Sequence, residues 1–433
     1  MTRKFALTQN ADHRRVLAQA VMLAMGVVGV AANTASAQTL YGGGATLPAV
    51  GYVGPTAALG GSTDTRLTNP VTETTSLFGA YASAHSESVS YCQTGSGTGK
   101  KVLGQWTSFA ANNTCGLFSG TPFGFSGAAA LPNFAASDAP LAQSEYSSVI
   151  TNVGVAPAQF PSVAGAIGII YNNTSVSSLN LTDSQVCEIF SGVITNWSQI
   201  SSASGAITVA YRTDGSGTSF SLSNHLSHVC TSAAEFKSSG EFFTTDQTFT
   251  NVVAHSGGLP SGAVGASGNP GVVNEVSATT NSIGYGEIAD ALNHDPVLQY
   301  ATVNSEDPVA NFGATFTITT TTGQVIAGVN TIGQATLGAI TGGSNTSCVV
   351  VAIPSSYAVP SSGYPIVAVS NLLGYYSGNG ATNAPLIQDL LSAPYTTSIK
   401  RAATDIGSGK GLAWVSDSSG NATTANVDLC IND

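Results

Sequence analysis

Segments typical of strands alternate with short helical segments along this chain, and this alternation limits its possible architectures. Residues 181–192 predict a helix, because Thr182 and Gln185 have capping-box spacing and Gly192 can end it. Four β-branched runs bounded by Gly, Pro or polar residues predict buried strands, at 165–172, 206–212, 347–353 and 364–371. Alternating strands and helices predict an α/β sheet with crossover connections.

Three segments fall outside this alternation. Residues 314–328 are rich in Thr and β-branched residues around one Gly, and they predict a hairpin. Residues 55–90 and 107–128 are rich in Ser, Thr, Gly and Asn, and we expect them to form surface loops. The chain contains no internal repeat.

The first 37 residues have the pattern of a secretory signal peptide. Arg3, Lys4, Arg14 and Arg15 precede an apolar run, and Ala35-Ser36-Ala37 is a small-x-small cleavage signature. The alternative is a membrane anchor, but the run is short for a span and no polybasic segment follows it. We therefore expect cleavage near Ala37 and a periplasmic or secreted protein.

The charge of the remaining chain argues against nucleic acid as a partner. Removing residues 1–37 takes four basic residues and one acidic residue from the 12 and 23 of the full chain, which leaves a net charge of −14. Nucleic-acid binding needs clustered Lys and Arg. A small anion remains possible, because neutral N–H and O–H groups with one Arg can hold it. The chain is 42% hydrophobic, which favours a folded protein over a disordered one.

Six cysteines, an even number, suggest disulfides in an exported chain. Six cysteines allow 15 pairings, and free buried thiols are a further alternative. Our hypothesis is sequential pairing. No pair of these residues, alone or with His, has the spacing of a zinc site. The three predicted disulfides are Cys92–Cys115, Cys187–Cys230 and Cys348–Cys430.

The segment 211–220 (YRTDGSGTSF) carries the clearest chemistry. It follows a predicted strand and opens a predicted helix, whose unpaired N–H groups and dipole favour an anion. Ser216 and Thr218 add hydroxyl donors, and Arg212 adds a two-pronged donor suited to phosphate oxygens. Asp214 is placed to hold the guanidinium in one rotamer. The alternative is an ordinary capped turn with a solvated Arg.

Three further turns are candidates of lower specificity. In GGGATLP (42–48), glycines permit close backbone approach, and Thr46 can cap a helix opened by Pro48. The turn TGSGTG (94–99) is a second candidate, and ASDAPL (136–141) is a third. Taken alone, a plain loop or turn is the simpler interpretation of each of the last two.

Other catalytic and metal signatures are weak or absent in the sequence. His225 and His228 are three residues apart on the predicted helix, and a surface pair is a simpler interpretation than a metal site. Neither Gly95-Ser96-Gly97 nor Gly215-Ser216-Gly217 is a GxSxG nucleophile elbow. The histidines still permit a Ser/His/Asp triad, but no motif points to one.

Taken in order, these segments resemble the phosphate-binding subunit of bacterial phosphate ABC importers. The resemblance is closest to its secreted branch, the DING phosphate-binding proteins. Leu47, the Cys187 and Cys230 pair and a Cys near the C-terminus are similar to that branch. The matching segments span nearly the whole chain after the signal: 42–48, 95–100, 136–141, 159–172, 181–197, 211–220, 281–287 and 362–374.

The resemblance implies an α/β, two-lobed periplasmic binding protein fold of type II, with the ligand cleft between the lobes and two hinge crossings. The crossings are expected near 163–170 and 361–367. The implied organisation is a signal peptide at 1–37, lobe I from 38–168 plus 364–433, and lobe II from 169–363.

The resemblance also implies a set of phosphate ligands. Thr46 and Leu47 would contribute backbone N–H and hydroxyl contacts, and Ser96 would bind through its hydroxyl and amide. Asp138 would be the only acceptor, and Asp214 would orient the arginine. The donors of the second lobe would be Arg212, Ser216, Gly217 and Thr218.

These residues explain a preference for phosphate over sulfate. Phosphate still carries a proton near neutral pH, and a buried carboxylate such as Asp138 can accept that hydrogen. Sulfate carries no proton and would face that carboxylate unpaired, which is unfavourable. Lobe closure would dehydrate the anion and align the donors.

The leading hypothesis is therefore a monomeric binding protein for inorganic phosphate, without cofactor or metal, serving phosphate uptake or scavenging. An ABC permease in the inner membrane is an expected partner. The alternative is a secreted phosphatase or phosphodiesterase of DING type, although the sequence shows neither a two-metal cluster nor an activated nucleophile. A third class, an adhesive surface protein, is suggested only by the Ser/Thr/Gly-rich loops.

Overall fold

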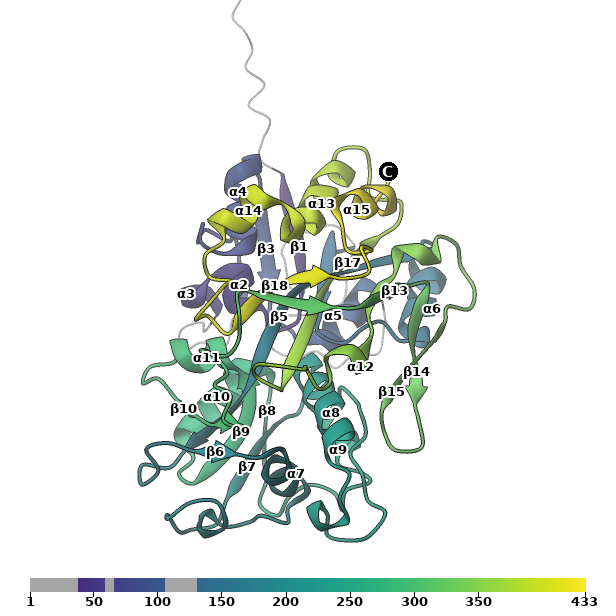
Figure 1. The fold of residues 1–433 in the computed structure, drawn as a ribbon. Helices are drawn as coiled ribbons and strands as arrows, with labels where there is room; N and C mark the ends of the chain where they lie inside the picture. Colours follow the sequence, from purple (N-terminus) through teal and green to yellow (C-terminus); the bar gives the residue numbers. More distant parts are fainter. Residues whose placement is uncertain (1–37, 59–65, 106–130) are drawn as a thin grey trace, which may run out of the picture. The chain divides into compact units, whose positions relative to one another are not determined.

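The computed structural model describes residues 38–58, 66–105 and 131–433. Its principal element is a twelve-stranded sheet, whose main path runs β2-β3-β1-β4-β17-β5-β9-β7-β8 (Figure 1). Strand β1 pairs in parallel with both β3 and β4, while β2 pairs with β3 in the antiparallel sense. The strands of this first part are β2 (Leu67–Thr68), β3 (Ser88–Cys92), β1 (Thr39–Gly44) and β4 (Phe134–Ser137).

Strand β5 (Pro157–Asn172) connects the two parts of the sheet. Its first residues, through Ala166, pair with β17 (Val367–Tyr375), and from Ile167 onward it pairs with β9 (Ser282–Glu287). This change of partner falls within the predicted crossing at 163–170. All residues of β5 except the last are buried, and its second half contains the buried strand predicted at 165–172.

The second part of the sheet is parallel at its centre. Strand β7 (Thr208–Arg212) pairs in parallel with β9 on one side and β8 (Val264–Ala266) on the other. Helix α10 (Gly268–Ala278) packs on these strands, as parallel strands covered by helices require. The predicted α/β fold with two hinge crossings is confirmed, whereas the predicted lobe boundaries stay a prediction.

The two predicted helices form where their caps indicated. Helix α7 (Asp183–Ser191) begins after Thr182, whose hydroxyl accepts from the Gln185 N–H, and it ends at Gly192 in the left-handed conformation. Helix α8 (Gly217–Val229) follows β7 and is capped by Ser216. The remaining helices from α2 to α11 are α2 (Ala49–Val53), α3 (Pro55–Ala58), α4 (Leu77–His85), α5 (Ser96–Leu103), α6 (Gln143–Val153), α9 (Phe249–Val252) and α11 (Ile288–Asn293).

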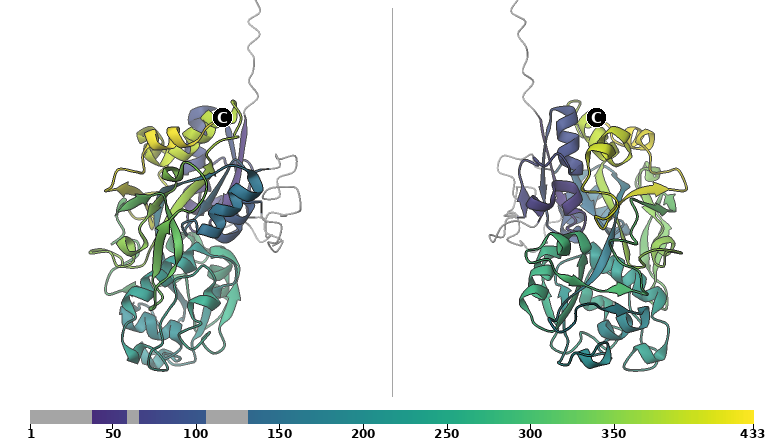
Figure 2. Two further views of the ribbon diagram at one scale, coloured as in Figure 1. Left: turned by 90° about the vertical axis from the view of Figure 1, so that its right-hand side faces the viewer. Right: turned by 60° about the vertical axis from the view of Figure 1, so that its left-hand side comes forward.

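The C-terminal segment returns to the N-terminal part of the sheet. In both views of Figure 2 the yellow C-terminal helices lie beside the purple N-terminal ones, and α14 packs against α4. Strand β18 (Leu412–Asp417) pairs with β5. The helices of this region are α12 (Pro354–Tyr357), α13 (Asn383–Ser392), α14 (Thr397–Ala402) and α15 (Thr424–Cys430).

The predicted hairpin at 314–328 is wrong. Strand β12 (Thr315–Ile318) pairs in parallel with β18, and β13 (Thr320–Thr322) pairs with β16 (Val350–Ala352). The hairpin that does form joins β14 (Gln324–Val329) to β15 (Ala335–Ala339). Local sequence indicated strands here correctly, but their partners lie far along the chain. Because β12 pairs with β18, this part of predicted lobe II packs against a strand that was assigned to lobe I.

The prediction of a surface loop at 55–90 is also wrong. Helix α4 and strand β3 occupy much of it, and Leu77, Phe78 and Tyr81 are fully buried. Helix α4 begins after Ser76, whose hydroxyl accepts from the Gly79 N–H. In the sequence, Gly, Ala and Ser residues stand between these large side chains, so the apolar face of α4 was not recognised. The second predicted loop, 107–128, lies outside the described residues.

Two of the predicted disulfides are present. Cys187–Cys230 joins α7 to the end of α8, and Cys348–Cys430 ties the segment before β16 to the last helix. Cys92 is also disulfide-bonded. Its predicted partner Cys115 lies outside the described residues, so that pairing stays a prediction, as does the signal peptide at 1–37. Among the residues that the structure describes, no helix is long and apolar enough to cross a bilayer.

Candidate functional site

Three helices begin at the turns that surround the predicted anion site. Helix α5 begins at Ser96, α8 begins at Gly217 and α10 begins at Gly268. Each helix is joined to the preceding strand of the sheet by a short turn (Figure 1). The first N–H groups of each helix therefore lie near the end of a strand. Unpaired N–H groups and aligned helix dipoles at one place favour a negative charge.

Arg212 is buried and held by Asp214, as the sequence predicted. The guanidinium donates from Nε to Asp214 Oδ1 at 2.7 Å and from Nη2 to Asp214 Oδ2 at 2.5 Å. Burial opposes ionisation of both groups, but their pairing outweighs it, raising the pKa of Arg212 and lowering that of Asp214. The Gly268 N–H adds a bond to Asp214 Oδ1 at 2.9 Å. The arginine therefore stays charged in a rigid position.

Asp138 is a buried carboxylate that accepts two hydroxyl hydrogen bonds. Ser370 Oγ donates to Oδ1 at 2.6 Å, and Ser96 Oγ donates to Oδ2 at 3.2 Å. Burial raises the pKa of Asp138 to about 6, although these bonds and the charges of Arg212 and Lys100 oppose the shift. Two ionised oxygens offer about four acceptor positions, so the carboxylate can still accept a further proton donor.

The turns that carry these groups approach one another closely. The Gly97 N–H donates to Gly215 O at 2.8 Å, which joins the turn before α5 to the turn before α8. A Cβ added at Gly217 would collide with Asp138 and lie 2.5 Å from Ser96 Oγ. Only glycine permits this approach of backbone to side chain. The two predicted halves of the site are therefore in contact.

Thr46 does not cap a helix, contrary to the prediction. Helix α2 begins after Pro48 without a side-chain cap, and Thr46 Oγ1 instead accepts from the Asn269 N–H at 3.2 Å. The hydroxyl is turned toward α10 and away from its own helix. Because Oγ1 accepts in this contact, its own proton stays available to a ligand.

The hydroxyls on α8 have different roles. Ser216 Oγ caps the helix by accepting from the Ser219 N–H at 3.0 Å, which leaves its proton available. Thr218 Oγ1 accepts from Arg212 Nη1 at 3.3 Å and donates to Asn269 Oδ1 at 3.2 Å. The Thr218 hydroxyl is thus engaged in the arginine network.

The structure brings the predicted ligand residues together, while their role in binding phosphate stays a prediction. Leu47 follows Thr46, and its side chain packs toward Gly165 on β5, which does not bear on the contact predicted for its backbone N–H. The others are joined through hydrogen bonds, shared partners or the close approach at Gly217. These are Thr46, Ser96, Asp138, Arg212, Ser216, Gly217 and Thr218.

Sequence reasoning missed three residues that support this site. Asn269 binds Arg212 Nη1 at 2.9 Å, and Ser370 binds Asp138. Lys100, buried, pairs with Glu145 at 2.8 Å and donates to Pro140 O at 3.2 Å, which holds the turn after Asp138. Lys100 and Ser370 lie inside segments already singled out. The Gly-Asn-Pro sequence after β8 was the available signal for Asn269.

Two further acids are buried beside the site. Burial raises the pKa of Asp290 to about 8, and it raises that of Glu287 well above its usual value. Both oxygens of Asp290 and Oε2 of Glu287 lack a hydrogen-bond partner among the described residues. Burial therefore favours the neutral form of both acids.

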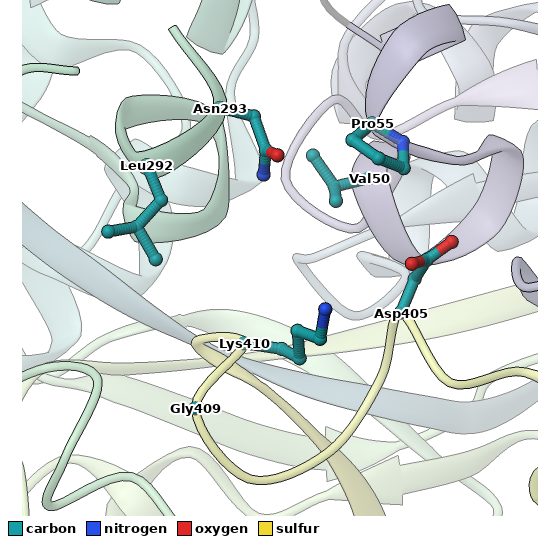
Figure 3. A pocket seen from close by; sticks show the side chains of 7 residues that line it. All are labelled: Val50, Pro55, Leu292, Asn293, Asp405, Gly409 and Lys410. Atoms are coloured by element: carbon teal, nitrogen blue, oxygen red, sulfur yellow. The ribbon is translucent and has the colours of Figure 1, made fainter.

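The histidines on α8 and the nearby pocket are not part of this site. His225 is buried and contacts Ala358 O and Asp183, so the expected surface pair with His228 is wrong. No group of three potential metal ligands occurs within the described ranges. None of the predicted phosphate ligands lines the pocket of about 150 Å³ in Figure 3, whose lining residues are Val50, Pro55, Leu292, Asn293, Asp405, Gly409 and Lys410.

Known proteins similar to this chain include phosphate-binding proteins. Alkaline phosphatase L of Pseudomonas aeruginosa PAO1 is 33% identical over 281 residues, which are 64% of this chain and 63% of that protein. Phosphate-binding protein PstS of Xylella fastidiosa is 36% identical over 177 residues, 38% of this chain and 43% of that protein. The matches thus span less than two thirds of these relatives.

The fold comparison covers more of the chain. A solved phosphate-binding protein from Stenotrophomonas maltophilia has a TM-score of 0.59 at 25% identity, covering 91% of this chain and 98% of that one. The resemblance to phosphate-binding proteins is confirmed. A family model described as a PBP superfamily domain matches residues 31–391. Since this match includes most of the sequence, the chain belongs to the PBP superfamily.

Proposed function

We propose that this chain is an exported binding protein that captures inorganic phosphate between its two lobes. The observation that carries the proposal is the position of Asp138. It is a buried carboxylate bonded to Ser96 and facing the helix α8 that carries the other predicted donors. The names of the relatives given above support the same ligand.

The proton of phosphate explains why a carboxylate suits this site. Burial raises the pKa of Asp138 to about 6, so at neutral pH the carboxylate is largely ionised. It can therefore accept a hydrogen bond from the proton that phosphate still carries. Sulfate has no proton to share near neutral pH, so its oxygen would oppose the carboxylate.

The donors balance the remaining charge of the anion. Arg212 is fixed by Asp214, which leaves only part of its charge for the ligand. Helix N-termini and the protons of Thr46 and Ser216 supply the rest as neutral dipoles. Such a site holds a dehydrated anion without a cluster of basic residues, which agrees with the acidic composition of the chain.

The first prediction concerns selectivity. In Asp138→Asn, the acceptor for the phosphate proton is weakened and the unfavourable contact with sulfate is removed. We expect the ratio of phosphate to sulfate affinity to fall roughly tenfold or more. Isothermal titration of phosphate-stripped protein measures both affinities, and Arg212→Ala should weaken both anions together.

Asp389→Asn is the control for this experiment, because Asp389 is half-exposed and its carboxylate pairs with His85 and not with a predicted ligand. Its affinities should match those of the unmodified chain. An unchanged ratio in Asp138→Asn would remove Asp138 from the selectivity argument. Equal binding of phosphate and sulfate by the unmodified chain would contradict the proposed function itself.

A phosphatase is the second candidate, because a relative bears the name Alkaline phosphatase L. In such an enzyme Ser216 would be the first residue to test as a nucleophile. Its hydroxyl accepts from the Ser219 N–H, and it has no His partner within the described part of the chain. Phosphate release from p-nitrophenyl phosphate that persists through repurification and is lost in Ser216→Ala would favour the enzyme.

We further propose that the chain acts outside the cytoplasm as a monomer and delivers phosphate to an ABC permease. Two disulfides and the family fold support export. N-terminal sequencing of the secreted chain should find a start near Gln38. Phosphate uptake that is lost with this protein and restored by it would support delivery to a permease over scavenging alone.

A further inference from the structure

Asn269, at the start of α10, links groups from several parts of the site. Its backbone N–H donates to Thr46 Oγ1 at 3.2 Å. Its side-chain oxygen Oδ1 accepts from Arg212 Nη1 at 2.9 Å and from Thr218 Oγ1 at 3.2 Å. Three of the predicted phosphate ligands therefore meet on this one residue.

The chemistry of its partners fixes the orientation of the Asn269 amide. A guanidinium can only donate hydrogen bonds, so the amide oxygen and not the nitrogen must face Arg212. Turning the amide over would set its NH₂ group against an N–H of the arginine. The nitrogen Nδ2 must consequently lie on the other arm of the amide.

That nitrogen is a buried donor without a partner. Asn269 is fully buried, and Nδ2 makes no hydrogen bond with any residue that the structure describes. Leaving a buried donor unsatisfied is unfavourable, and native proteins rarely retain one without a reason. The residue stands at the N-terminus of an eleven-residue helix, whose dipole favours an anion at the same place.

We propose that Asn269 is a further ligand of the phosphate site and that its Nδ2 donates to the bound anion. The inference rests on the proposed function, since it requires an oxyanion beside Arg212 and Thr218. In this role the oxygen of the amide positions the arginine while the nitrogen binds the ligand. The Asn269 backbone also directs the Thr46 hydroxyl, so one residue orders donors on both sides of the cleft.

The obvious competitor for Nδ2 is a buried acid nearby. Asp290 also has no hydrogen-bond partner among the described residues, and it interacts electrostatically with Arg212. If Asp290 were the true partner of Nδ2, the anion would gain nothing from this nitrogen. A structure of the phosphate complex distinguishes the two.

Two measurements test the proposal. In a crystal structure of the unmodified chain with inorganic phosphate, we expect Nδ2 at hydrogen-bonding distance, roughly 3 Å, from a phosphate oxygen. In titration calorimetry, Asn269→Ala should bind phosphate roughly 10- to 100-fold more weakly, the range for a hydrogen bond to a charged group. The crystal structure does not depend on whether the variant folds.

Asn224→Ala is the matched control. Asn224 is another buried Asn, on α8, whose Nδ2 donates to Pro354 O at 2.8 Å, and its Oδ1 also lacks a partner. Its loss should lower stability and leave phosphate affinity unchanged. A complex in which Nδ2 is bonded to Asp290 and not to phosphate would overturn the proposal, as would full affinity in Asn269→Ala. Failure of the unmodified chain to bind phosphate would instead contradict the proposed function.

Discussion

The buried acid Asp290 gives the pH dependence of stability a specific source. Burial raises its pKa to about 8, although the charges of Arg212 and Arg66 oppose the shift. In the unfolded chain this carboxyl releases its proton near pH 4. Between these two values the folded state binds more protons than the unfolded state, so stability present at low pH is lost as the pH rises.

Replacing Asp290 by Asn should remove this contribution. We subtract the free energy of unfolding of the unmodified chain from that of Asp290→Asn at each pH. This difference should be larger at pH 8 than at pH 5, by roughly 1–4 kcal/mol. Urea denaturation at the two pH values measures it, with Asp389→Asn as the exposed control. A difference that does not change with pH would mean that Asp290 is ionised in the fold.

Sequence reasoning identified residues whose role is local and missed those whose role depends on distant partners. Arg212 and Asp214 are two residues apart, so their pairing was visible in the sequence. Ser370 lies more than 200 residues after Asp138, and only the pairing of β17 with β4 brings the two together. Asn269 was missed for the same reason, because β8 must pair with β7 before α10 can reach Arg212.

At the scale of elements, the caps of α7 and the buried runs were predicted well, while the Thr46 cap and the strand pairing were not. Helix α7 begins after Thr182 and ends at Gly192, as expected. The Thr-rich run at 314–328 forms strands, but β12 pairs with β18 near the end of the chain. Alternation fixes which faces of a strand are buried, whereas a partner strand is selected by the packing of the whole sheet.

The disulfide between α7 and α8 offers a prediction at this scale. Cys187–Cys230 closes a loop of 43 residues, and its removal restores chain entropy to the unfolded state. We expect Cys187→Ala with Cys230→Ala to lower the free energy of unfolding by about 4 kcal/mol or less. Phosphate affinity should be unchanged in the folded variant, because the bond lies at the opposite end of α8 from Gly217. A matching loss of affinity would mean that the bond shapes the site.

At the scale of the whole molecule, the site exists only where both parts of the sheet bring their turns together. Strand β5 pairs with β17 up to Ala166 and with β9 beyond it. This arrangement places the start of α8 next to Asp138. The family resemblance predicted this arrangement from short motifs. Periodicity alone predicted only an α/β sheet, because the meeting of residues 96, 138 and 217 is a property of the complete topology.

The close approach at Gly217 makes closure of the lobes testable. A methyl group there would collide with Asp138 and Ser96 across the cleft. The backbone of Gly217 is helical, and alanine is a better helix former than glycine. In an open, phosphate-free form this contact would be relieved, so Gly217→Ala should keep or raise the stability of that form while weakening phosphate binding roughly 100-fold.

Small-angle scattering separates loss of closure from loss of fold. The unmodified chain should contract when phosphate is added, whereas Gly217→Ala should keep the dimensions of its phosphate-free state. Gly313→Ala is the control, because a Cβ there meets its nearest atom at an ordinary 3.6 Å. If Gly217→Ala contracts and binds like the unmodified chain, the contact between α8 and Asp138 is not what closes the lobes. Phosphate would then be held chiefly by the residues of one lobe. In that case only one of the two variants Arg212→Ala and Asp138→Asn, which lie in different predicted lobes, should change phosphate affinity strongly.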